Sequence, residues 1–359
     1  MTFRVVQWTS GGVARQAVGA ILADPRLELV GMYAFSEVKE GRDAGELVGL
    51  APLGVTATHS VDEIIALAPD CVSYSPLYPD VDHLEALLAA GINVVTTCNF
   101  ITGWGLDYKA RGADGPSPRQ RLARAGKLGN ATIFGTGINP GHINYLACVV
   151  SAHCQQVRKL TVTESVDVFH FVGDPNMDRI GYGLAIDTPG LAAQVKEETS
   201  VFGDALELMA SLLDMRLDGI ECHVEYAAAT RDIDAPGRYI SQGSIAAARL
   251  RWVGSVGGQE LLENEQVWVA GEHTAAPWDV RHGYSVFVQG EPDMYNTLLP
   301  IPAGDVSALS PADMNALGMR ITALPSINAI PAVCAAAPGI RTYRDLPPVA
   351  AAGMAGVTA

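Results

Sequence analysis

The sequence is poor in basic residues and has no apolar run of the length that spans a membrane. Lys and Arg number 24 against 39 Asp and Glu, so the formal net charge is −15. Nucleic-acid binding needs clustered basic residues, and a membrane span needs about 20 consecutive apolar residues. The start of the chain also lacks the cationic segment and apolar run of a secretory signal. We therefore expect a cytoplasmic protein that binds neither nucleic acid nor membrane.

Metal-binding motifs are also missing. The six cysteines are scattered, with no C-x-x-C pair, and the sequence contains no H-E-x-x-H. Structural zinc sites need closely spaced Cys and His ligands. We therefore expect reduced, mostly buried cysteines and no metal.

The N-terminal stretch does carry a recognisable pattern. An apolar strand over residues 3–8 runs into Gly11 and Gly12, and a helical pattern follows. The dinucleotide fingerprint G-x-G-x-x-G/A is matched at Gly11 and Ala14 but not at Thr9. A turn without side chains lets the backbone approach a pyrophosphate, and the helix start stabilises its charge. The alternative is a strand, turn and helix without a ligand.

Strands and helices alternate after this stretch. The pattern predicts strands over residues 27–35, 54–57, 71–74, 92–97 and 131–134, with helices between them, including one over 42–50. Such an order with short connections favours a parallel sheet. We therefore predict an α/β fold with a Rossmann domain over residues 1–140.

Consecutive strands follow in the middle of the chain. They are expected at 158–171, 220–229, 244–253, 266–269 and 284–289, with a helix over 191–213. This order predicts an α+β domain over 141–310, built on a mixed or antiparallel sheet. A last helix, in a segment 311–345 that returns to the Rossmann domain, should be interrupted at Pro325.

Ligands of open parallel sheets lie outside the carboxyl ends of the strands. At the second strand end, Ser36 and Lys39 replace the acidic residue that binds the ribose of NAD, which favours NADP. Alternatively, both are solvated loop residues. The strand ends give these cofactor-binding candidates: Ser10, Gly11, Gly12, Ser36, Lys39, Ser75, Thr97, Cys98 and Asn139.

Four side chains could take part in chemistry, two near these strand ends and two on the strand expected over 158–171. Cys98 could act as a thiolate with His142 as its base, which would indicate aldehyde oxidation, or it could be a small apolar filler. His142 could instead donate a proton to substrate or simply line the cleft. Glu164 and Asp167 should point to opposite faces of their strand, so one of them could enter the cleft.

Several longer motifs together resemble a known family. They are residues 5–8 (VVQW), 42–47 (RDAGEL), 91–97 (GINVVTT), 135–141 (GTGINPG) and 328–333 (NAIPAV). The chain resembles the dihydrodipicolinate-reductase-like group, and within it 2,4-diaminopentanoate dehydrogenase and the native amine dehydrogenases. The resemblance implies a Rossmann domain, a C-terminal domain whose sheet makes a homodimer, and hydride transfer to an imine or carbonyl carbon. It also implies cofactor contacts at Val13 and, near the nicotinamide, Asn328.

One departure concerns the loop after the fifth strand, where native amine dehydrogenases carry a glutamate. The loop here has Asn99, whose amide takes no proton at neutral pH. Phe100 and Trp104 suggest an apolar substrate pocket, or else they pack under the loop. The proton-donor candidates are therefore Glu164, Asp107 and His142, in that order.

Taken together, the sequence predicts an NADP-dependent oxidoreductase that reduces a C=N or C=O bond in a small, apolar substrate. Two alternatives stay open: aldehyde dehydrogenation through Cys98, and a non-catalytic NADP-binding sensor or scaffold.

Overall fold

The chain divides into two compact units. The structure, a computed structural model, describes residues 2–278, 280–302 and 310–351. Residues 2–142 and 316–351 form the first unit, called the Rossmann unit below. Residues 143–302 and 310–315 belong to the second unit. The Rossmann unit is therefore built from both ends of the described chain, and the second unit is inserted into it.

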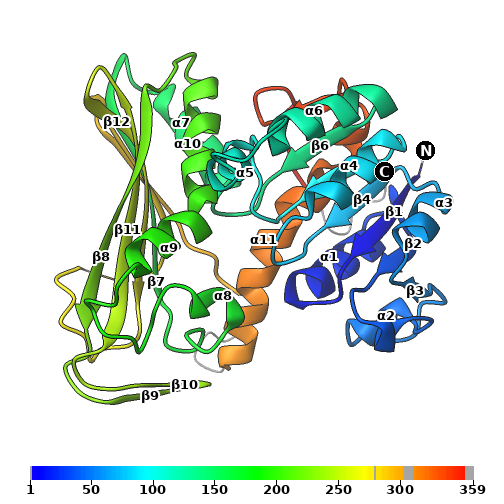
Figure 1. The fold of residues 1–359 in the computed structure, drawn as a ribbon. Helices are drawn as coiled ribbons and strands as arrows, with labels where there is room; N and C mark the ends of the chain where they lie inside the picture. The colour runs from blue at the N-terminus through cyan, green and yellow to red at the C-terminus, as the bar shows by residue number, and fades with distance from the viewer. Residues whose placement is uncertain (1, 279, 303–309, 352–359) are drawn as a thin grey trace. The chain divides into compact units, whose positions relative to one another are not determined.

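The Rossmann unit contains a seven-stranded parallel sheet in the order β15-β6-β5-β4-β1-β2-β3 (Figure 1). The order reverses between β1 and β4, which is where a ligand crevice is expected. The predicted α/β fold is confirmed. The strands are β1 (Phe3–Trp8), β2 (Leu27–Tyr33), β3 (Ala57–Thr58), β4 (Cys71–Tyr74), β5 (Asn93–Thr96), β6 (Thr132–Gly135) and β15 (Gly339–Arg341).

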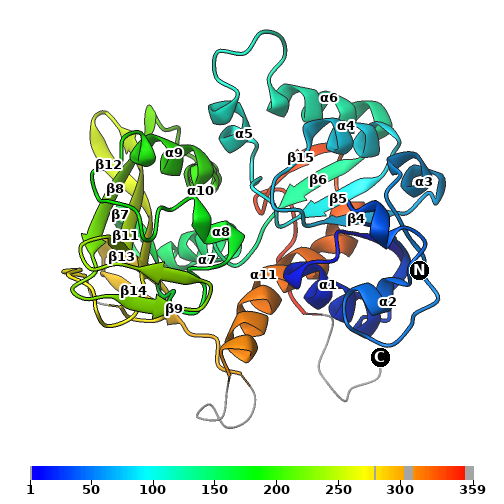
Figure 2. The ribbon, with the colours of Figure 1, turned by 60° about the horizontal axis from the view of Figure 1, so that its bottom comes forward.

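Helices cover both faces of this sheet, with α4 and α6 on one side and α1 and α11 on the other (Figure 2). Apolar positions of α4 and α6 pack on the central strands because their spacing places them on one helix face. The helix expected over 42–50 is confined to Ala44–Leu47 and is followed by Gly49 with a φ of 72°. The helices are α1 (Gly12–Ala23), η1 (Glu37–Lys39), α2 (Ala44–Leu47), α3 (Val61–Ala66), α4 (Val81–Ala89), α5 (Trp104–Lys109), α6 (Pro118–Gly129) and α11 (Pro311–Cys334).

Helix α11 differs from the expectation, because it runs without interruption through Pro325 and Pro331. A proline inside a helix costs about 3 kcal/mol, and here burial offsets that cost. Ile327, Ile330 and Val333 are fully or almost fully buried. By length and composition alone α11 could cross a membrane, and 33% of its apolar window is buried inside the structure.

The second unit contains a six-stranded sheet in the order β14-β13-β7-β12-β11-β8. Strands β7 and β12 pair in parallel and the other neighbours are antiparallel, so the sheet is mixed, as predicted. A separate hairpin joins β9 to β10. The strands are β7 (Gln156–Asp167), β8 (Gly219–Ala228), β9 (Ile233–Ala235), β10 (Arg238–Ile240), β11 (Ile245–Val256), β12 (Gln259–Val269), β13 (Gly283–Glu291) and β14 (Met294–Leu298).

Helix α10 packs against β8, β11 and β12 on one face of this sheet. The single helix expected over 191–213 is in fact two helices that meet at Thr199. Thr199 Oγ1 donates to the Val195 carbonyl oxygen at 2.6 Å and accepts from Trp252 Nε1 at 3.2 Å. Both bonds lie at the break between the two helices. The helices between residues 142 and 212 are α7 (His142–Ser151), α8 (Pro175–Asp178), α9 (Leu191–Glu198) and α10 (Ser200–Leu212).

Candidate cofactor site

The turn after β1 has a backbone conformation that normally requires glycine. Thr9, at the first position of the fingerprint, has a φ of 84°, which is an outlier for a β-branched residue. Such a conformation costs on the order of 1–3 kcal/mol and persists only where neighbouring interactions enforce it. The Thr9 hydroxyl donates to the carbonyl oxygen of Ser75 at 3.2 Å. Thr9, the residue that does not match the fingerprint, is therefore strained. The turn forms in spite of this mismatch.

Hydrogen bonds between β1 and the loop after β4 hold this turn. The buried Gln7 donates from Nε2 to Ser75 Oγ at 2.8 Å and to the Trp8 carbonyl oxygen at 2.8 Å. Ser75 Oγ donates to the same Trp8 oxygen at 3.2 Å. Because β1 and β4 are the neighbours between which the strand order reverses, Ser75 ties together the two sides of the expected crevice.

The start of α1 presents bare backbone. Its N-cap residue is Gly11, which has no side chain to cap the helix. Gly11 and Gly12 are exposed, and a Cβ on Gly11 would meet no described atom within 4 Å. The first N–H groups of a helix carry partial positive charge and bind anions such as phosphate. This turn, which continues into the half-buried Val13, therefore fits a pyrophosphate.

The ammonium group of Lys39 lies against the same turn. Lys39 Nζ donates to Ser10 Oγ at 2.9 Å. Ser36 is exposed at the start of η1, and its carbonyl oxygen accepts from the Lys39 N–H at 2.8 Å. The ammonium group of Lys39 thus lies beside the glycine turn, and Ser36 lies on the segment just beyond the end of β2. Both can donate hydrogen bonds to a phosphate.

A hollow of about 640 Å³ lies near the ends of β2 and β4. Its walls include Phe35, Leu77 and Tyr78, whose side chains are 57%, 45% and 40% exposed. Phe35 packs edge-on against Tyr33 with ring centroids 5.3 Å apart, and Tyr33 stacks on Trp8 at 3.9 Å. The buried rings support an exposed aromatic and aliphatic wall that suits a flat, apolar ring system.

The loop after β5 is mostly built into the core. Phe100 is completely buried, and burial of Cys98 raises the pKa of its thiol to about 12. Trp104 stacks on Tyr108 with centroids 5.0 Å apart. Thr97 and Asn99 are half-buried between these residues. Phe100 therefore packs under the loop and does not line an open pocket. Thr97, Asn99 and Trp104 are partly exposed.

Asp107, the second proton-donor candidate, joins two helices. Its Oδ2 accepts from Ser117 Oγ at 2.9 Å, and its Oδ1 accepts from the Arg119 N–H at 3.0 Å. Ser117 is the N-cap of α6. The carboxylate thus satisfies donors at the first turn of α6, a common structural task of an acidic residue.

The glycine-rich segment after β6 is folded tightly on itself. A Cβ at Gly135 would lie 1.9 Å from the Phe100 carbonyl oxygen. Gly141 has a φ of 127°, and a Cβ there would lie 2.7 Å from Thr136 Oγ1. The half-buried Asn139 lies between these two glycines in the sequence, after the end of β6. These glycines are therefore required by close packing of the chain with itself.

His142, at the start of α7, is bonded to a residue near the other end of the chain. Its Nδ1 lies 3.1 Å from the hydroxyl of Tyr343, and that hydroxyl lies 2.8 Å from Thr136 Oγ1. The Tyr343 ring packs edge-on against Phe134 at 5.1 Å. Burial lowers the pKa of His142, so its neutral form is favoured near neutral pH.

Glu164, the first proton-donor candidate, lies on β7 in the second unit. Trp268 Nε1 donates to Glu164 Oε1 at 3.0 Å. Tyr284 is its neighbour on β13, and burial together with the Glu164 carboxylate raises the pKa of that phenol. Glu164 is half-buried and lies on the same face of its strand as the buried Val162.

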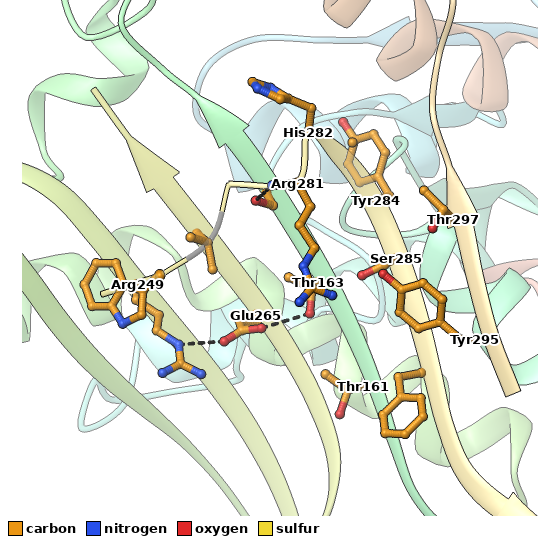
Figure 3. A pocket seen from close by; sticks show the side chains of 15 residues that line it. Thr161, Thr163, Arg249, Glu265, Arg281, His282, Tyr284, Ser285, Tyr295 and Thr297 are labelled. Carbon is orange, nitrogen blue, oxygen red and sulfur yellow. Dashed lines mark hydrogen bonds and ion pairs between the residues drawn. The ribbon is translucent and has the colours of Figure 1, made fainter. Parts of the chain in front are cut away.

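The second unit carries a larger hollow, of about 720 Å³ (Figure 3). There Arg249 donates from Nε to Glu265 at 2.6 Å, and Thr163 Oγ1 donates to Glu265 at 2.9 Å. The residues lining this hollow include none of the site residues expected from the sequence. Within the described ranges, no group of three or more His, Cys, Asp or Glu side chains could hold a metal ion.

The structure brings Ser10 and Lys39 into contact, and places Ser75 beside the same turn through Thr9. Asn328 is half-buried on α11. Sequence reasoning missed Gln7, Thr136 and Tyr343. For Gln7 a signal existed, since an amide inside a buried central strand needs a hydrogen-bonding partner. No pattern in the sequence indicated the contacts of Thr136 and Tyr343.

Comparisons with known proteins give relatives along nearly the whole chain. An amine dehydrogenase of Streptomyces virginiae is 26% identical, with 95% of each chain covered. A 2,4-diaminopentanoate dehydrogenase of Acetoanaerobium sticklandii is 21% identical, with 94% of this chain and 90% of that one covered. The solved structure of an amine dehydrogenase from Mycobacterium smegmatis has the same fold, with a TM-score of 0.77, 18% identity and 98% coverage of both chains.

The family of the 2,4-diaminopentanoate dehydrogenase C-terminal domain matches residues 142–358, which is more than half of the chain. The match includes the whole second unit together with α11 and β15. The chain is therefore an oxidoreductase, and it belongs to the 2,4-diaminopentanoate dehydrogenase C-terminal domain family.

Proposed function

We propose that the chain is an NADP(H)-dependent oxidoreductase that transfers a hydride to a C=N or C=O carbon of a small, apolar substrate. The observation that carries the cofactor preference is the bond from Lys39 Nζ to Ser10 Oγ. It holds an ammonium group between the end of β2 and the turn that fits a pyrophosphate. A 2′-phosphate needs such a donor, whereas a bare ribose of NAD is usually bound by an acidic residue.

Other features of the site also fit parts of a dinucleotide. The bare N–H groups after Gly11 fit the pyrophosphate. The hollow walled by Phe35, Leu77 and Tyr78 suits the adenine ring. Thr97, Asn139 and Asn328 are proposed contacts on the nicotinamide side. When bound, the cofactor supplies the hydride chemistry, while the protein orients it and moves one proton.

The amine dehydrogenase and the diaminopentanoate dehydrogenase among the relatives favour a carbon that carries nitrogen. The loop after β5 has Asn99 and no carboxylate that could take a proton. The proton must therefore pass to or from a side chain elsewhere in this protein. Glu164, Asp107 and His142 remain the proposed groups. We expect at least one of Glu164→Gln, Asp107→Asn and His142→Asn to lower turnover by about 10²-fold or more. Unchanged turnover in all three variants would rule out these assignments.

Nothing in the geometry favours aldehyde oxidation through Cys98. A thiol whose pKa is raised to about 12 by burial is almost entirely protonated at neutral pH, and the thiolate is the reactive form. We expect Cys98→Ala to remain active.

We further propose a cytoplasmic homodimer that pairs through the second unit. The sheet face opposite α10 carries the hollow of Figure 3. Light scattering should give twice the chain mass of 37.8 kDa. A mass of one chain at micromolar concentration would contradict this.

The decisive experiment is titration with NADPH and NADH, followed by NADPH oxidation across a panel of ketones, aldehydes and imines with and without ammonia. Lys39→Ala should weaken NADPH binding about tenfold, or about 1.4 kcal/mol, and leave NADH binding unchanged. Lys127→Ala, which removes an exposed lysine on α6, is the matched control. Tight NADPH binding without turnover of any compound would favour the sensor or scaffold alternative.

A further inference from the structure

Two cysteines from distant parts of the chain meet inside the Rossmann unit. Cys71 begins β4, and Cys334 is the last residue of α11. Cys334 Sγ donates to the carbonyl oxygen of Asp70 at 3.7 Å, a contact that spans 264 positions of the sequence. Asp70 directly precedes Cys71, and the thiols of Cys71 and Cys334 also contact each other, side chain to side chain. The two sulfur atoms are therefore neighbours.

The alternation of side chains along β4 explains why Cys71 faces α11. Successive side chains of a strand point to opposite faces of its sheet. Val72 and Tyr74 belong to a core cluster that includes Leu84 of α4. Cys71 therefore lies on the other face, which α1 and α11 cover (Figure 2). Cys71 is completely buried there, whereas Cys334 at the helix end keeps some exposure, so small molecules can reach the pair from the side of Cys334.

This difference in exposure gives the two thiols different roles. Burial and, to a smaller degree, the contact with Cys334 raise the pKa of the Cys71 thiol, so Cys71 stays protonated in the resting protein. Oxidants in solution react with exposed thiolates. Cys334 is therefore the thiol that an oxidant meets first, and Cys71 is the partner that can react with its oxidised form.

We propose that Cys71 and Cys334 are a redox-sensitive pair that hydrogen peroxide converts into a disulfide, which fastens the end of α11 to β4. The Cys334 thiolate first attacks the peroxide, becomes a sulfenic acid and releases hydroxide. The Cys71 sulfur then attacks the sulfenic sulfur, so that the S–S bond forms and the S–OH bond breaks. The protons of the two thiols join the two hydroxides as water. Two thiols and one peroxide thus give one disulfide and two water molecules, and the sulfurs lose two electrons to the peroxide.

The disulfide acts on the stability of the Rossmann unit. It joins β4 to α11, and the whole second unit lies between them in the sequence. A cross-link that closes so long a loop removes conformational freedom from the unfolded chain. Oxidation should therefore raise the melting temperature by roughly 5–10 °C, and reduction should reverse the rise.

Mass spectrometry of the full chain tests whether the bond forms. The protein is treated with hydrogen peroxide, its remaining thiols are blocked with N-ethylmaleimide in denaturant, and it is digested without reduction. A peptide that contains Cys71, joined to one that contains Cys334, should be present in most chains and disappear after treatment with dithiothreitol. Free thiols or sulfinic acid at these two positions, without the linked peptide, would overturn the proposal.

Single replacements separate the roles of the two thiols. In Cys71→Ala, peroxide should leave a sulfenic acid on Cys334 that dimedone labels, and the unaltered protein should take up at least about fivefold less label there. Equal labelling of the two proteins would exclude Cys71 as the partner of Cys334. Cys334→Ser, at a residue with some exposure, should form no linked peptide, and peroxide should not raise its melting temperature.

Cys154→Ser is the matched control. Cys154 is half-buried like Cys334, but its Sγ donates to the Pro292 carbonyl oxygen at 3.1 Å in the second unit. Peroxide should raise the melting temperature of this variant as much as that of the unaltered protein. An equal rise in Cys334→Ser would exclude the disulfide as the cause of the stabilisation.

Discussion

The two glycine-rich turns of the Rossmann unit use the same residue type for opposite purposes. At Gly11, after β1, the space where a side chain would lie is empty of described atoms within 4 Å. At Gly135, where β6 ends, that space is filled by the Phe100 carbonyl oxygen at 1.9 Å. The first turn is open and the second is closed. The fold therefore requires glycine at Gly135, whereas at Gly11 the open space agrees with the proposed approach of a ligand.

The largest expected effect is at the closed turn. Gly135→Ala places a methyl group on a backbone oxygen that cannot move away without shifting the loop after β5. We expect a loss of about 3–5 kcal/mol in the free energy of unfolding, measured by chemical denaturation. A variant as stable as the unaltered protein would show that the turn is not closed.

Gly11→Ala tests the open turn. Gly11 has an ordinary φ of −80° and no neighbour to clash with, so stability should change by less than about 0.5 kcal/mol. NADPH binding should weaken by about 10- to 100-fold, or about 1.4–2.8 kcal/mol, because the methyl group blocks the approach of the pyrophosphate. Titration with NADPH measures this, and equal affinity would contradict the assignment of the turn.

Thr9 lies at the entrance of the open turn, and its strain can be measured separately. In Thr9→Gly, release of about 1–3 kcal/mol of strain offsets the loss of a hydrogen bond, about 1 kcal/mol, and the extra chain entropy of glycine, about 1 kcal/mol. We expect stability within about 1 kcal/mol of the unaltered protein. Thr9→Val keeps the strain and loses the hydroxyl, so it should be less stable by about 1–2 kcal/mol. Denaturation curves for the pair decide the matter, since equal losses in both variants would mean that Thr9 is unstrained.

The smallest effect is a pH dependence at the closed turn. The pKa of His142 is lower in the folded protein than its ordinary value of about 6.5. Below pH of about 6.5 the unfolded chain therefore binds more protons than the folded one, and stability falls as the pH is lowered until the folded pKa is passed. His142→Asn should flatten this part of the stability curve between pH 7 and pH 5. An unchanged slope would mean that His142 is not the group responsible.

Much of the Rossmann unit could be predicted because its parallel strands are buried on both faces and give apolar runs between helices. Strand β15 could not be, because a segment as short as Gly339–Arg341 has no periodicity and pairs with β6 far away in sequence. The continuity of α11 through Pro325 was missed because burial outweighed propensity. The mixed sheet of the second unit was expected from its run of strands.

The candidate site was predictable where it follows the strand ends. The glycine turn and Ser75 follow strand ends, and Lys39 lies in η1 beyond the end of β2, so one rule about parallel sheets led to these candidates, which stay predictions. The bond between His142 and Tyr343 spans 201 positions, and no local pattern indicates it. Family motifs identified the relatives correctly, but none of them includes Tyr343.

The way the second unit is inserted into the Rossmann unit also affects how the protein can be made. Strand β15 completes a sheet whose first strands leave the ribosome some 300 residues earlier, and helix α11 covers part of one face of it. A nascent chain therefore cannot close this sheet, or place Tyr343 beside His142, until synthesis has passed the whole second unit. Until then the exposed edge of β6 and the sheet face that α11 covers invite aggregation.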